Sequence, residues 1–139
     1  MNSILITVTA VAALAAGHAG AQDAQRGVEL YRVCAACHSL EPERHLSGPS
    51  LAGAFGREAG KAAGFDRYSA GLKAADFVWD ADTLNAWLAD PQAMIPGTTM
   101  SFPGIEDDSA RADLVAFLTV AMAPGGHEAV VDQGLAPLE

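Results

Sequence analysis

Basic residues are scarce in this sequence of 139 residues. Lys and Arg together number 8 against 17 Asp and Glu, which gives a formal net charge of −9 at pH 7. Nucleic acids and anionic membrane surfaces attract proteins through clusters of Lys and Arg. The charge balance therefore excludes nucleic acid as a partner and makes binding to an anionic membrane surface unfavourable.

Cysteine is equally scarce, with two residues in the whole chain. A zinc site normally needs four Cys or His ligands, and a disulfide between cysteines only three residues apart closes almost no loop. A thioredoxin-like dithiol would lie in a βαβ pattern, and no segment has the strong alternation of a strand. Half of a zinc site, a redox dithiol and a structural disulfide are therefore the weaker explanations of the pair.

The sequence around the cysteines, Cys34-Ala35-Ala36-Cys37-His38, offers a better explanation. Two cysteines three residues apart, followed directly by a histidine, form the attachment signal for a c-type haem. On a helical turn the two cysteines lie on one side, so their sulfurs can bond the two porphyrin vinyl groups while the histidine binds the iron. The motif predicts one covalently attached haem and a redox function.

The N-terminal residues are apolar and uncharged. The run from Ile4 to Ala16 is followed by Ala19-Gly20-Ala21, the small-x-small form that a signal peptidase accepts. We expect a signal peptide over residues 1–21, since a retained anchor, the alternative, needs about 20 apolar residues to span a membrane. The protein is therefore expected to be exported, with the periplasm as its compartment and no stable membrane insertion.

Three helical segments are predicted from the spacing of apolar residues. The first runs from residue 24 into the haem motif, the second from 80 to 90 and the third from 107 to 123. Between residues 39 and 79, glycine and proline recur too often for a long helix or a sheet. Three modest helices make a small core for a chain of this size, and a buried haem would supply the missing apolar centre.

The predicted domain spans residues 22–123. The last segment, 124–139, shows no convincing period and is expected to form a flexible C-terminal tail. His45, His127 and the scattered acidic residues have no partner at the spacing of metal ligands, so we expect them to be solvated surface residues.

Six motifs follow one another along the chain between Arg26 and about Val120. They are, in chain order, Cys34-Ala35-Ala36-Cys37-His38, Gly48-Pro49-Ser50-Leu51, Phe55-Gly56-Arg57, Trp79, Ile95-Pro96-Gly97-Thr98-Thr99-Met100 and Asp113-Leu114-Val115-Ala116-Phe117-Leu118. In these motifs and in their order the chain resembles the class I cytochromes c of the mitochondrial and bacterial type. The resemblance implies an all-α cytochrome c fold, with three to five short helices and Gly-rich loops wrapped around one covalently bound haem. It also implies a monohaem one-electron carrier rather than an enzyme.

The resemblance assigns the two ligands of the iron. His38 would be the proximal ligand, with the carbonyl of Pro49 accepting a hydrogen bond from its other ring nitrogen. Met100 would be the distal ligand, and its thioether raises the reduction potential by favouring ferrous iron. Met94 and Met122 lie outside this loop motif and are expected to fill gaps in the core.

Buried haem propionates need hydrogen-bond donors, and similar proteins supply them from a known set of positions. Tyr68 and Ser69 match that set only if one extra residue follows Phe65. The resemblance also places Gly27 and Tyr31 where the first helix crosses the last. The residues that match propionate donors are Arg57, Tyr68, Ser69, Trp79 and Thr98.

Two departures from the mitochondrial pattern concern the haem edge and the distal ligand. Trp87 stands where those proteins carry a tyrosine that donates to the ligand sulfur. The lysines that ring the haem edge in those proteins are replaced, so we expect the redox partners, donors and acceptors, to have basic or neutral docking surfaces. We expect the protein itself to be a monomer. The residues at the lysine positions are Arg32, Val33, Gln92, Ala93 and Thr99.

Two other functions use the same haem motif. The protein could be a dedicated electron-accepting subunit of a periplasmic dehydrogenase, which differs from a free carrier only in stable association. It could also be a ligand-binding or peroxidatic haem protein, which would need an open iron position that a ligating Met100 denies.

Overall fold

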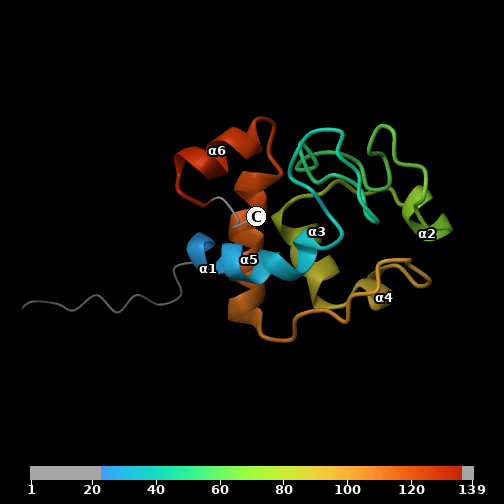
Figure 1. The fold of residues 1–139 in the computed structure, drawn as a ribbon. Helices are drawn as coiled ribbons and strands as arrows, with labels where there is room; N and C mark the ends of the chain where they lie inside the picture. The colour runs from blue at the N-terminus through green and yellow to red at the C-terminus, as the bar shows by residue number, and fades with distance from the viewer. Residues whose placement is uncertain (1–22, 136–139) are drawn as a thin grey trace, which may run out of the picture.

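The computed structural model describes residues 23–135, which contain six helices and no strand (Figure 1). The predicted signal peptide and the last four residues, 136–139, lie outside the described residues. In the part of the chain that is described, no single helix is long and apolar enough to cross a membrane. The helices are α1 Ala24–Ala35, α2 Ala70–Lys73, α3 Ala81–Ala89, α4 Pro91–Met94, α5 Asp108–Ala121 and α6 Gly126–Asp132.

The three predicted helices correspond to α1, α3 and α5. Each begins after an aspartate whose side chain accepts hydrogen bonds from the first backbone N–H groups, which have no partner inside the helix. At α3 the cap is reciprocal, because Thr83 N donates to Asp80 Oδ1 at 2.8 Å and Asp80 N donates to Thr83 Oγ1 at 2.9 Å. The short helices α2 and α4 were not expected, and Pro91, which ends the predicted second helix, begins α4.

The core forms where α1 crosses α5 (Figure 1). A Cβ atom added at Gly27 would lie 2.7 Å from the Cβ of Phe117 and closer still to the carbonyl oxygen of Asp113. Only glycine permits this approach. The ring centroids of Tyr31 and Phe117 lie 5.3 Å apart beside the crossing, and both side chains are almost completely buried.

Asp113 corrects the expectation that the acidic residues are solvated. Asp113 is only 4% exposed. Its carboxylate accepts a hydrogen bond from Asp23 N at 2.7 Å and forms an ion pair with Arg26 at 3.2 Å. A buried carboxylate requires such partners because burial removes its hydration. The side chain therefore fastens the start of α1 to the middle of α5.

The structure differs from the expected tail, because residues 126–132 form α6 and pack against α5. The two helices are bent by 113° at the break between them. Gly125 adopts a left-handed conformation at φ 72°, and a side chain on Gly126 would strike the end of α5. Val130 and Leu135 are buried against the core. Seven residues with one buried valine give too short a pattern to detect as a helix.

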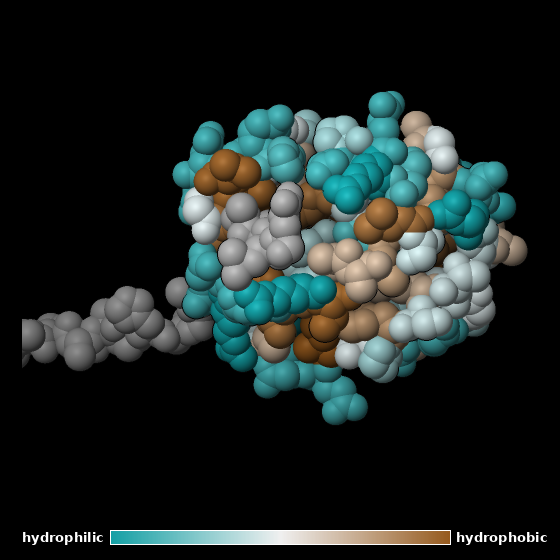
Figure 2. Space-filling view, viewed as in Figure 1, coloured by the Kyte–Doolittle hydropathy of each residue, from teal (hydrophilic) through white to brown (hydrophobic). Residues whose placement is uncertain are grey.

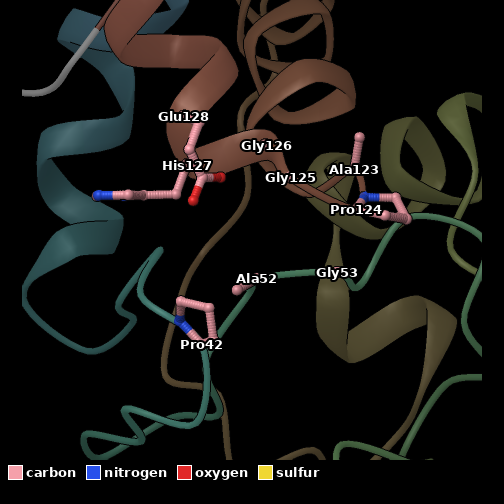
Figure 3. A pocket seen from close by; sticks show the side chains of 9 residues that line it. All are labelled: Pro42, Ala52, Gly53, Ala123, Pro124, Gly125, Gly126, His127 and Glu128. Atoms are coloured by element: carbon pink, nitrogen blue, oxygen red, sulfur yellow. The ribbon is translucent and has the colours of Figure 1, made fainter.

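A pocket lies where α6 begins (Figure 3). Pro42, Ala52 and Gly53 form one side, and residues 123–128 form the other. None of the predicted haem-site residues lines it.

Replacing Val130 with alanine will test whether α6 belongs to the cooperative fold. Val130 is 1% exposed, so the truncation should lower the free energy of unfolding by about 1–3 kcal/mol. The neighbouring Val131 is 55% exposed and supplies the matched control, because Val131→Ala should change stability by less than about 0.5 kcal/mol. Equal effects of the two variants in denaturant unfolding would show that α6 is not packed on α5.

Candidate haem site

The attachment motif continues the end of α1 by one turn. The carbonyl of Cys34 accepts hydrogen bonds from Cys37 N at 3.0 Å and from His38 N at 2.9 Å. This turn exposes Cys37 and leaves Cys34 half-buried, with both thiols free. Burial raises the pKa of the Cys34 thiol to about 11, although backbone hydrogen bonding opposes the shift. Two free thiols one turn apart suit thioether attachment to one porphyrin.

His38 is held by the chain on two sides. Its Nδ1 lies 2.8 Å from the carbonyl oxygen of Pro49, which fixes the tautomer with the proton on Nδ1 and leaves Nε2 to bind a metal. A Cβ at Gly48 would lie 2.7 Å from Nδ1, so the loop approaches the ring as closely as a glycine permits. The Tyr31 hydroxyl donates to the His38 carbonyl at 3.2 Å. Burial lowers the pKa of His38, partly offset by the Pro49 carbonyl, and favours the neutral ligand form.

Arg57 carries a buried donor with no partner. Among the described residues, its Nε is the one buried side-chain polar atom that makes no hydrogen bond, while its Nη1 donates to Ala52 O at 3.4 Å. An orphaned guanidinium N–H of this kind fits an anionic oxygen, such as that of a haem propionate. Trp79 lies beside it, because Trp79 N donates to Arg57 O at 3.0 Å. The residues present therefore fit a haem.

Tyr68 and Ser69 each have a local role that leaves a hydroxyl proton available. The Tyr68 hydroxyl accepts a hydrogen bond from Ala62 N at 3.2 Å, and Ser69 Oγ accepts one from Leu72 N at 3.3 Å as the cap of α2. In both cases the hydroxyl can still donate. Neither contact tests the predicted role toward a propionate.

The loop that carries Met100 is held by Thr98 and by Gln92. Thr98 is buried, and its Oγ1 accepts a hydrogen bond from Met100 N at 3.4 Å. The Gln92 side chain donates to Thr98 O at 3.0 Å and accepts from Gly97 N at 3.3 Å. In the sequence, Gln92 stands out only as a position where a lysine of the mitochondrial proteins is replaced, because nothing there signals that its side chain folds back onto its own loop.

One buried cluster connects the separate parts of the candidate site. The half-buried side chains of Cys34, Tyr68, Trp79 and Met100 all pack against it. Trp87 is buried within the same cluster, and its ring lies edge-on to Trp79 with centroids 5.6 Å apart. Apolar side chains, shown in brown, also come to the surface between polar ones on the face in Figure 2.

His45 corrects a second expectation, since it is half-buried and both of its ring nitrogens make hydrogen bonds within the protein. Its Nδ1 accepts a hydrogen bond from Ser50 N at 3.0 Å, so Nε2 carries the proton and donates to Ala63 O at 2.9 Å. The ring also packs against Phe65, with centroids 5.5 Å apart. His45 therefore joins the loop that holds His38 to the loop that leads to Tyr68.

Cys34 and Cys37 lie on one turn, His38 is oriented with Nε2 free, and Arg57 Nε has no partner among the described residues. This is the arrangement expected of a small all-α protein built around a c-type haem. The family model for Cytochrome c matches residues 24–120. The chain is 40% identical over 107 residues to cytochrome c of Guizotia abyssinica, covering 76% of this chain and 96% of the relative. It is 37% identical over 119 residues to cytochrome c2 of Blastochloris viridis, covering 85% and 93%.

A solved structure agrees with the family match. Cytochrome cH from Methylobacterium extorquens superposes with a TM-score of 0.63 at 41% identity, covering 69% of this chain and 96% of that one. The chain belongs to the cytochrome c family. Its members carry one covalently attached haem c with iron and transfer electrons between redox partners. The expected family, fold and cofactor are thereby confirmed, and the family match ends before α6.

Replacing His45 with alanine should destabilise the protein, although every residue of the haem motif itself is kept. The change leaves Ser50 N without its acceptor in a residue that is 3% exposed, at a cost of about 1–3 kcal/mol in the free energy of unfolding. His127→Ala, at an exposed position on α6, is the control and should be neutral within about 0.5 kcal/mol. The free energies of unfolding of the two variants are compared by denaturant unfolding. An equal decrease in both would show that His45 does not link the two loops.

Proposed function

We propose that this protein is an exported one-electron carrier whose haem iron is bound by His38 and Met100. The observation that carries the proposal is the hydrogen bond from His38 Nδ1 to the Pro49 carbonyl, which fixes the proton on Nδ1 and orients the imidazole with Nε2 free. The bound haem supplies reversible gain and loss of one electron. Met100 is the matching ligand because its loop is held in place by Thr98 and Gln92, and a thioether favours ferrous iron.

The remaining site residues hold the propionates. Arg57 Nε offers a charged donor in a buried position, where it has no other partner. The indole N–H of Trp79 and the hydroxyl of Thr98 add neutral donors, and Tyr68 and Ser69 add the two hydroxyls described above. Fixed donors of this kind reduce the rearrangement that accompanies a change of charge at the haem.

The carrier acts as a monomer between protein donors and acceptors and turns over no substrate. The signal at Ala19-Gly20-Ala21 supports export to the periplasm, and the charge of −9 supports partners with basic or neutral docking surfaces.

Carbon monoxide binding tests the ligand set. With His38 and Met100 both on the iron, ferrous wild-type protein should keep its spectrum under carbon monoxide at neutral pH, because no position is open. Met100→Ala should open the site, permit binding and lower the reduction potential, because the thioether that favours ferrous iron is gone.

Met94→Ala is the matched control for that experiment, since Met94 is a half-buried methionine six residues earlier in the chain. It should leave both the spectrum and the absence of binding unchanged. Rapid carbon monoxide binding by the wild-type protein would contradict the carrier function and favour a ligand-binding haem protein.

Mass spectrometry of the native protein tests attachment and export together. The intact mass should equal a chain that starts at Gln22 plus one haem, and acidic organic solvent should not remove the haem. A haem lost in that solvent would contradict thioether bonds at Cys34 and Cys37, and a chain that starts at Met1 would contradict processing.

A further inference from the structure

The two segments that carry the proposed iron ligands contain no charged residue. From Val33 to Leu40 and from Pro91 to Ile105 the sequence has no Asp, Glu, Lys or Arg, although charged residues bound both segments. Every one of the 17 acidic residues therefore lies elsewhere. In a protein with a net charge of −9, these two segments contribute no charged side chain of their own.

Both segments are exposed at several positions. Val33 is 66% exposed, and Cys37, four residues later, is exposed as well. Arg32, the cation next to Val33, pairs with Glu29 at 3.3 Å, so the charge at this end of α1 is compensated within the helix. The exposed residues of the second segment are Gln92, Ala93, Pro96, Gly97, Thr99, Ser101 and Pro103.

Both segments contact the buried core of the protein. Cys34 from the first and Met94, Ile95 and Met100 from the second pack against the same buried cluster. If His38 and Met100 bind one iron, as proposed above, the segments border one haem from its two sides. We name their exposed residues together the neutral rim.

We propose that the neutral rim is the docking surface for a redox protein whose own face around its cofactor is uncharged and apolar. A charged side chain of the partner placed here would lose hydration and find no opposite charge, which costs free energy. A basic partner would instead be drawn to the acidic surface outside the rim and would bind away from the haem. The inference rests on the proposed function and selects neutral partners over basic ones.

Two blue copper proteins serve as probes, one with an apolar uncharged face around its exposed copper ligand and one with a lysine-rich face. Each is titrated into ferrous, 15N-labelled holoprotein, and the dissociation constant comes from chemical-shift changes. With the apolar probe, the shifts should map to the neutral rim, and the dissociation constant should change by less than about twofold between about 20 and about 200 mM salt.

Val33→Asp places a charge in the rim and should weaken binding of the apolar probe by at least about tenfold. Val33→Ile should bind like the wild type. Val131→Asp makes the same substitution at a 55% exposed valine on α6, outside the rim, and should change the dissociation constant by less than about twofold.

Three results would overturn the proposal: no detectable binding of the apolar probe, equal weakening by Val33→Asp and Val131→Asp, or tighter binding of the lysine-rich probe with shifts in the rim. The reversibility of haem reduction and the spectrum under carbon monoxide are measured on the same samples. If reduction is not reversible and carbon monoxide binds, the carrier function itself is contradicted. If only the titrations differ from expectation, the neutral docking surface alone is contradicted.

Discussion

The close approach of α1 to α5 at Gly27 is the constraint on which the rest of the structure depends. α1 carries the attachment turn at its C-terminal end, so the position of Cys34 and His38 is set by where α1 crosses α5. The contact of Gly27 with Phe117 fixes the distance, and the bonds from Asp23 and Arg26 to Asp113 fix the start of the helix. Packing within the core thus places reactive groups at its edge.

The parts of the fold that follow from local sequence were predictable. α1, α3 and α5 combine apolar residues at helical spacing with an aspartate cap, and both signals can be seen without the fold. α6 escaped prediction because its burial depends on a sharp turn at Gly125 and on a surface supplied by α5. Asp113 and His45 escaped for a related reason, since each has a partner that is distant in sequence, Asp23 N for Asp113 and Ala63 O for His45.

The candidate site divides in the same way. The haem motif is a local signal, and its turn is present in the structure as a continuation of α1. The resemblance placed Pro49 opposite His38, and the structure has that hydrogen bond. The roles of Met100 and Arg57 toward iron and propionate stay predictions, although the partnerless Nε of Arg57 is what such a role requires. Gln92 could not be found from the sequence, because a glutamine that braces a loop looks like any exposed glutamine.

Most bonds that hold the loops have a backbone carbonyl at one end. His38 is oriented by the oxygen of Pro49, His45 donates to the oxygen of Ala63 and Gln92 donates to the oxygen of Thr98. A carbonyl is present whatever side chain occupies the position. Each of these hydrogen bonds therefore constrains the identity of one side chain only, that of the donor. The side chain at an accepting position such as 63 can change as long as the backbone conformation is kept. A lineage can thus exchange much of its loop sequence while His38 keeps its orientation.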